Sequence, residues 1–327
     1  MSRARLILVA AGILAVAASL AFVRTTDSST HACLYWGPRT VHYKINYGRT
    51  IAVSTPPVSP TCTQAAETAA ITTAFAQWTG TSSGGMQSCT DLDLVFDGAS
   101  TSPVGYDRSG VNENTIAFRS GWCSVVAPGC TDAANTPISQ TCANLHNCFE
   151  DSAENTRATL ALTTTTYNQN TGEILDADTE LNGWDGNGGA VSAGQPADGW
   201  YFTCVDPPKS LCTSYGEGAC TYVDVRNTIT HEAGHFIGLA HAPAVAGQPV
   251  PTMYAYSAPG DFELRSLEQD DVNGLCTIYP ANKATVTCVD APHHSGGGCA
   301  SGGAGAGASA LLLAAAALLP RLRRRRA

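Results

Sequence analysis

Strand-like and helix-like periodicities alternate along the first part of the chain. Within residues 36–47, hydrophobic and polar side chains alternate with a period of two, which predicts a strand. Residues 65–78 carry apolar side chains at helical spacing and predict an amphipathic helix. Two more strands are predicted over 92–96 and 114–119. The pattern therefore indicates a protein that contains both strands and helices.

A β-hairpin is predicted in the middle of the chain. Residues 159–167 are rich in threonine and alternate, 168–172 form a polar turn, and 173–182 alternate again. Three acidic residues lie on alternate positions of the second strand: Asp176, Asp178 and Glu180.

A capping-box pattern predicts that a helix begins near the start of segment 266–279. Ser266 and Gln269 have the spacing of a capping box at its beginning. We interpret the acidic pair Asp270 and Asp271 as structural and not catalytic.

The candidate chemistry is concentrated between His231 and His241, which hold three of the eight histidines of the chain. His231 and His235 are four residues apart and share one face of a helix, so both can bind one metal ion. Glu232 points about 100° round the helix, where a general base can reach a water without ligating the metal. Gly238 can end the helix in the left-handed conformation and bring His241 back as a third ligand. Three imidazoles leave one zinc position open, as in catalytic sites.

This run matches the extended signature HExxHxxGxxH and resembles the metzincin zinc peptidases. Met253, in the segment 251–256, resembles the Met-turn that lies beneath the zinc in this clan. Met253 followed by Tyr254 is similar to the matrixins, and we expect Tyr254 and Tyr256 to line the pocket or pack. The resemblance implies an α+β metzincin catalytic domain, with a twisted, mostly parallel sheet, an antiparallel edge strand, an active-site helix and a C-terminal helix.

The resemblance also implies the function. One catalytic Zn²⁺ on His231, His235 and His241 would activate a water, and Glu232 would be the general base in peptide-bond hydrolysis. Protein or peptide substrates would bind extended along the edge strand 159–167. The alternative is a catalytically silent metzincin-fold protein that serves surface binding or adhesion.

Three features depart from the matrixin pattern. The chain has no cysteine-switch propeptide before the first strand and no counterparts of the histidines that hold a structural zinc. Four cysteines in the loop 120–156 offer disulfides as a substitute. A Ca²⁺ site at Asp176, Asp178 and Glu180, or within 185–189, is the alternative to a solvated acidic face.

Thirteen cysteines, far more than a cytosolic enzyme usually carries, predict an oxidising, extracytoplasmic location with up to six disulfides. The N-terminus agrees with this prediction. Arg3 and Arg5 precede an apolar run, and small residues follow, so residues 1–21 are predicted to be a secretory signal peptide.

The C-terminus is predicted to anchor the protein. Residues 283–301 form a glycine-rich linker that contains Cys299, and 302–327 combine an apolar segment with an arginine-rich tail. This ending resembles the Myxo-CTERM sorting signal of myxobacterial surface proteins, in which the cysteine is the point of processing and lipid attachment. The resemblance implies a lipoprotein held at the cell surface or outer membrane.

Between these ends, residues 30–282 are long enough for one peptidase domain. Removal of both end signals would take away seven arginines and no acidic residue, so the net charge would change from −9 to −16. Such an acidic protein is a poor partner for nucleic acid. We expect a monomer that contacts the membrane only through its anchor.

Overall fold

The structure is a computed structural model, which describes residues 22–47, 63–120, 122–123, 127, 129–130, 140–149, 159–183, 201–204, 222–258, 260–288 and 307–312. The predicted signal peptide, Cys299, the segment 185–189 and the arginine-rich tail lie outside the described residues. Among the described helices, none has the length and apolar character needed to cross a membrane.

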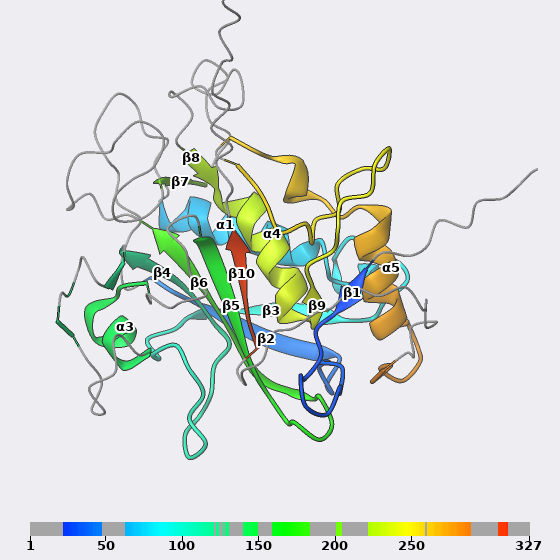
Figure 1. Ribbon diagram of the computed structural model, residues 1–327, viewed down its shortest axis with the longest axis horizontal. Helices are drawn as coiled ribbons and strands as arrows, with labels where there is room; N and C mark the ends of the chain where they lie inside the picture. The colour runs from blue at the N-terminus through cyan, green and yellow to red at the C-terminus, as the bar shows by residue number, and fades with distance from the viewer. Residues whose placement is uncertain are drawn as a thin grey trace, which may run out of the picture.

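The described part is an α+β structure built on one sheet (Figure 1). Five strands lie in the order β5-β6-β4-β2-β3, and a sixth, β10, pairs with the outer side of β5. The pairs β2–β3, β2–β4 and β4–β6 are parallel, whereas β5 is antiparallel to β6. The predicted α+β class and mostly parallel sheet are therefore confirmed, whereas the antiparallel strand β5 is not the edge strand that was expected, because β10 lies outside it. The strands are β2 (Thr40–Asn46), β3 (Asp93–Ala99), β4 (Thr115–Ser120), β5 (Thr159–Tyr167), β6 (Ile174–Gly183) and β10 (Gly307–Leu312).

Short strands lie outside this sheet. β1 (Val23–Arg24) pairs with β9 (Leu239–Ala240), and β7 (Tyr201–Thr203) pairs with β8 (Tyr222–Asp224). The β1–β9 pair brings the beginning of the described chain next to the segment that precedes His241.

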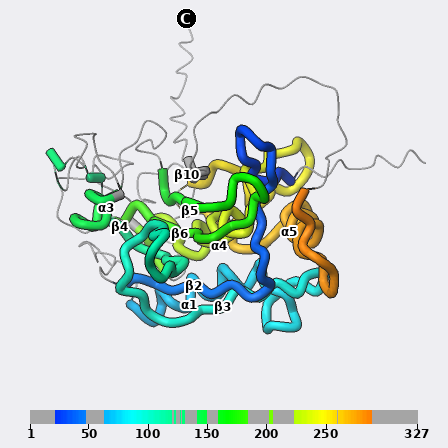
Figure 2. The backbone as a smooth tube through the Cα atoms, turned by 90° about the horizontal axis from the view of Figure 1, so that it is seen from below, coloured from blue at the N-terminus to red at the C-terminus, as the bar shows by residue number. Residues whose placement is uncertain are grey.

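The helices are α1 (Gln64–Ala76), α3 (Gln140–His146), α4 (Val225–Phe236) and α5 (Gln269–Ile278), with 3₁₀ turns η1 (Thr81–Ser83) and η2 (Glu263–Arg265). α4 packs on both α1 and β5 (Figures 1 and 2). The aromatic core joins these layers, because Phe75 of α1 stacks on Tyr43 of β2 at 4.0 Å and meets Phe236 of α4 edge-on at 5.3 Å. The histidine-bearing helix is thus fixed on the sheet by a buried apolar face.

One local prediction was wrong. The closing helix begins at Gln269, and its capping box is formed by Glu268 and Asp271 instead of Ser266 and Gln269. Ser266 is extended, and its carbonyl oxygen accepts a hydrogen bond from the Thr252 hydroxyl. This tertiary contact keeps Ser266 out of the helix and moves the cap by two residues.

Disulfides join cysteines that are distant in the chain and brace the loop after β4. The described pairs are Cys33–Cys288, Cys89–Cys276, Cys123–Cys148 and Cys130–Cys142. The last two confirm that the predicted loop 120–156 is held by its own cysteines. Several disulfides are consistent with an extracellular protein.

Candidate metal centre

The helix that carries the candidate ligands is fixed at its beginning. Asp224 is its N-cap, and its carboxylate accepts a hydrogen bond from the Asn227 N–H at 2.6 Å. Arg265 of η2 donates to the same carboxylate, with 2.8 Å from Nε to Oδ1. Nearer its middle, Trp78 donates its indole N–H to the Thr230 carbonyl oxygen at 2.8 Å. These contacts fix the rotation of α4 about its axis and therefore the direction of its histidines.

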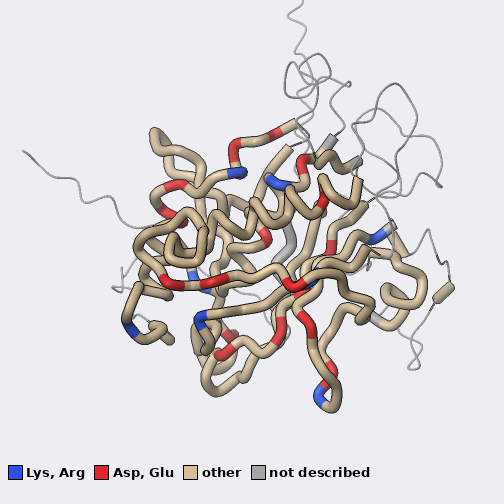
Figure 3. Tube along the Cα trace, turned by 180° about the vertical axis from the view of Figure 1, so that it is seen from behind, with Lys and Arg blue, Asp and Glu red and all other residues tan. Residues whose placement is uncertain are grey.

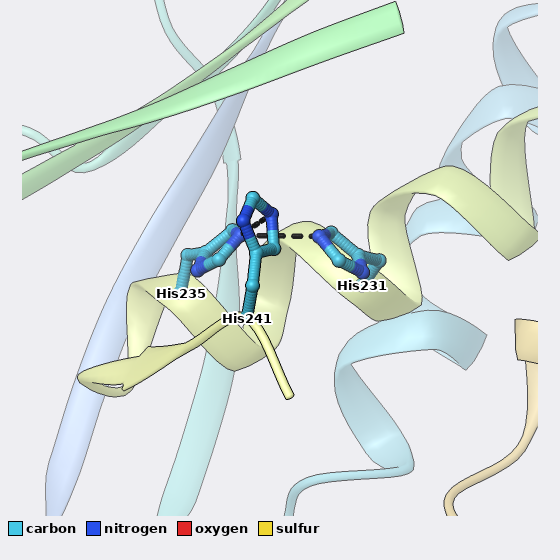
Figure 4. A group of neighbouring side chains, drawn as sticks. All are labelled: His231, His235 and His241. Carbon is cyan, nitrogen blue, oxygen red and sulfur yellow. Dashed lines mark hydrogen bonds between the residues drawn. The ribbon is translucent and has the colours of Figure 1, made fainter. Parts of the chain in front are cut away.

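His231, His235 and His241 point toward one another (Figure 4). The Nε2 atoms of His231 and His235 are 3.1 Å apart, and those of His235 and His241 are 3.2 Å apart. Tetrahedral zinc with Zn–N bonds of about 2.0–2.1 Å would separate two ligand nitrogens by about 3.3–3.4 Å. The three side chains could hold a metal ion, and they are the only such group of histidine, cysteine or carboxylate side chains among the described residues.

Backbone carbonyls set the tautomers of the two helical histidines. The Nδ1 of His231 is 2.7 Å from the Thr252 oxygen, and the Nδ1 of His235 is 2.8 Å from the Leu239 oxygen. A carbonyl only accepts, so each Nδ1 carries the proton and each Nε2 presents a lone pair. Lone pairs so close together repel each other unless a cation lies between them, as in metal sites with outer carbonyl partners.

The charge states agree with metal binding. Burial, followed by the proximity of His241, lowers the pKa of His231 to about 3. Burial also lowers the pKa of His235, and the two neighbouring histidines lower it further. The pKa of His241 is lowered by burial. All three imidazoles are therefore neutral near pH 7, the form that ligates metal.

Gly238 makes the turn that returns the chain to the site. Its φ is +92°, in the region that favours glycine, and its N–H bonds to the His235 carbonyl oxygen at 2.9 Å. An added Cβ would lie 2.5 Å from the Leu34 carbonyl oxygen. Both the conformation and the close approach require glycine here, and three residues later the chain presents His241.

Glu232 is fully buried beside the histidines. Its Oε2 accepts a hydrogen bond from the Thr163 hydroxyl of β5 at 2.6 Å. Its Oε1 is buried and finds no hydrogen-bond partner among the described residues. Burial raises the pKa of Glu232 to about 8, whereas the Thr163 hydrogen bonds act in the opposite direction. A cation on the three imidazoles would also favour the ionised carboxylate.

Met253 lies beneath α4 in a turn closed by the Tyr254 N–H and the Pro251 carbonyl oxygen. Its sulfur fills the space next to Gly234, where an added Cβ would be 2.1 Å from Sδ. Asp271 of α5 holds the turn, because its carboxylate accepts the N–H groups of Thr252 at 2.7 Å and Met253 at 3.1 Å. This contact gives Asp271 the structural role that its sequence position suggested.

The acidic residues of β6 have internal partners. Glu180 forms a buried ion pair with Arg119 of β4. The Asp178 carboxylate accepts the N–H groups of Thr115 at 2.7 Å and Gly105 at 2.6 Å. These residues are buried, so the expectation of a solvated acidic face was wrong. Among the described residues, no set of three carboxylate oxygens converges here as a Ca²⁺ site would require.

The candidate substrate strand β5 borders α4. Its outer side is paired antiparallel with β10, with Ala310 opposite Leu162 and Ser309 opposite Thr163. An extended peptide that binds this side of β5 would have to replace β10.

Sequence reasoning missed Thr163 and the two carbonyl partners of the histidines. The alternation of β5 could have indicated that Thr163 faces inward, but not that it meets Glu232. The carbonyl contacts depend on backbone positions that no residue type encodes.

The fold and the three histidines define an α+β protein with a candidate metal centre. The sequence matches no protein-family model, and no curated protein matches it.

Proposed function

We propose that the protein is a secreted, surface-anchored zinc endopeptidase of the matrixin-like metzincin type. The observation that carries this proposal is the pairing of three convergent imidazoles with a buried carboxylate, one oxygen of which has no hydrogen-bond partner among the described residues. A closed structural site would need no such carboxylate, whereas hydrolysis needs a base beside the metal. The extended motif from His231 to His241 and the turn at Met253 support the family resemblance.

Zinc, when bound, supplies Lewis acidity toward a water molecule and the scissile carbonyl. Oε1 of Glu232 accepts the proton of the attacking water and afterwards passes it to the leaving amine, while Oε2 stays bonded to Thr163. His231 and His235 hold their rings fixed through the Thr252 and Leu239 carbonyls, so little reorganisation accompanies the reaction. Once β10 is displaced, the outer backbone N–H and C=O groups of β5 would align an extended peptide through main-chain hydrogen bonds.

The location follows from the disulfides and the two ends of the chain. The predicted signal peptide supports export, and the ending around Cys299 supports a lipid anchor at the cell surface. The acidic net charge favours protein or peptide substrates over nucleic acid. In the described part of the chain, acidic positions outnumber basic ones (Figure 3).

The test compares wild type with Glu232→Gln, which keeps the size of the side chain and removes its basicity. Both proteins are purified at full length, their zinc is measured by mass spectrometry, and hydrolysis of casein is followed with and without a chelator. We expect about one zinc per chain in both proteins, activity that the chelator removes and zinc restores, and a loss of about 10²–10⁴-fold in Glu232→Gln.

Two results would contradict the proposal. If Glu232→Gln has wild-type activity, Glu232 is not the general base. A zinc-loaded wild type that hydrolyses neither casein nor a peptide library would favour the alternative, a surface binding or adhesion protein built on the same fold.

A further inference from the structure

We propose that Thr163 is a positioning residue for Glu232, which holds one carboxylate oxygen so that the other is directed to the reacting water. This inference rests on the proposed peptidase function. Thr163 lies on β5 and Glu232 on α4, so the contact joins the sheet to the active-site helix across 69 residues of sequence.

The hydrogen bond has the geometry of a strong contact. The distance from Thr163 Oγ1 to Glu232 Oε2 is 2.6 Å, within the range of a hydroxyl that donates to an ionised carboxylate. The two residues are 1% and 0% exposed, so water does not compete for either atom. The same hydroxyl is 3.4 Å from the Glu232 backbone oxygen, a longer and weaker contact. The Thr163 hydroxyl therefore donates its proton to the carboxylate oxygen Oε2 and not to the backbone oxygen.

A second threonine orients the first. Thr179 of β6 is the direct cross-strand neighbour of Thr163, and their hydroxyl oxygens are 2.9 Å apart. Since Thr163 gives its proton to Glu232, Thr179 must donate in this pair. The result is a directed chain from Thr179 through Thr163 to Glu232. β6 is paired on both sides, with β5 and β4, so the chain begins on a fixed part of the sheet.

The two carboxylate oxygens of Glu232 therefore have different surroundings. Oε2 is bound, and Oε1 has no partner among the described residues. A glutamate has three rotatable side-chain bonds, and without an anchor a buried carboxylate would sample several positions. The Thr163 hydroxyl selects one of them, which should lower the reorganisation needed for proton transfer.

The critical variant is Thr163→Val, which keeps the β-branched shape and removes the hydroxyl. Thr163→Ser restores the hydroxyl on a smaller side chain. The matched control is Thr115→Val, which removes a fully buried hydroxyl from β4 of the same sheet, where it donates to the Glu113 carbonyl oxygen at 3.1 Å. All are compared with wild type on a quenched fluorescent peptide that wild type cleaves, with zinc content and the thermal midpoint of unfolding measured in parallel.

We expect Thr163→Val to lose about 10- to 100-fold in kcat with KM within about threefold of wild type, because the loss of one charge-assisted hydrogen bond has this magnitude. Zinc should stay at one per chain, Thr163→Ser should recover most of the activity, and Thr115→Val should leave kcat unchanged. A crystal structure of Thr163→Val should show the Glu232 carboxylate displaced from β5.

Each contrary result has a distinct meaning. A wild-type kcat in Thr163→Val, or an unmoved Glu232 in its structure, overturns the inference and leaves the peptidase intact. A raised KM with normal kcat assigns Thr163 to substrate binding, and loss of zinc assigns it to the metal site, so both overturn it too. If zinc-loaded wild type cleaves no peptide, the proposed function fails first.

Discussion

Gly234→Ala should destabilise the protein, although alanine is the better helix former. Gly234 lies inside α4, one residue before His235. An added methyl carbon would be 2.1 Å from Met253 Sδ and 2.9 Å from Trp78 Cζ2. Non-bonded contacts lie near 3.5–4.0 Å, so the sulfur would have to move by about 1.5 Å.

The neighbours of Gly234 have little room to move. Met253 is 2% exposed, and its turn is held by Asp271. Trp78 is 0% exposed, and its ring is tied to the Thr230 oxygen. Overpacking of this kind costs about 1–3 kcal/mol, and we take the upper end because both neighbours are fixed. The higher helix propensity of alanine offsets about 1 kcal/mol of this cost, so the free energy of unfolding should fall by about 2 kcal/mol.

The assay is guanidinium unfolding with the disulfides intact, applied to a double-mutant cycle of Gly234→Ala and Met253→Ala. Met253→Ala alone should lose about 2–5 kcal/mol, because it leaves a cavity. The double variant should lose about 2 kcal/mol less than the sum of the single losses, since the methyl then fills part of that cavity. If Gly234→Ala stabilises the protein by about 1 kcal/mol, as in an open helix, the close approach of Met253 to α4 is refuted.

Three further predictions concern the turn, the pH response and the sheet edge. Gly238→Ala should lower the free energy of unfolding by about 1–3 kcal/mol and weaken zinc binding, measured by chelator competition. The control is Gly247→Ala, which is also at positive φ but has open space around it. It should lower stability and leave zinc binding unchanged. In the metal-free protein, the contribution of His231 to stability should be fully present above pH 6.5 and be lost at up to about 1.4 kcal/mol per pH unit as the pH falls toward 3, because its folded pKa of about 3 lies below its unfolded value and unfolding takes up a proton. Other buried groups add their own pH dependence, so the measurement is the difference between wild type and His231→Asn in pH-dependent unfolding, and an equal slope in both proteins would contradict the prediction. A chain that ends at residue 299 lacks β10 and should show a lower KM for extended peptides than the full chain, and an equal KM would argue against substrate binding along β5.

Local periodicity was enough to predict strands β2 to β6 of the main sheet and helix α1, but not the short strands outside this sheet. The strand 159–167 was predicted with the bounds of β5, and the helix 65–78 corresponds to α1 within two residues. In α1 the pattern is set by one buried face, whereas β5 is buried on both faces along its first five residues. The predicted strand 36–47 is longer than β2, which begins only at Thr40, because Pro38 lacks a backbone N–H and precedes the paired segment.

The ligand group was predictable because its three members are close in sequence. His231 and His235 depend only on helical geometry, and His241 depends on one glycine turn. The partners that orient the site come from other segments and carry no local signal. The capping box shows the same limit, since Ser266 satisfied the sequence rule but was already engaged by Thr252.

These orienting contacts connect one disulfide to the candidate site. Asp271 holds the Thr252–Met253 turn, and the Thr252 carbonyl in turn holds His231. Cys276, one turn and a residue further along α5, is joined to Cys89, 187 residues earlier in the chain. By loop-closure entropy a crosslink of this span raises the free energy of the unfolded chain by about 5 kcal/mol. The crosslink also restrains α5, and with it the segment that fixes the His231 tautomer. The candidate metal ligands are therefore oriented by covalently braced structure, which would reduce the reorganisation that binding of a metal ion requires.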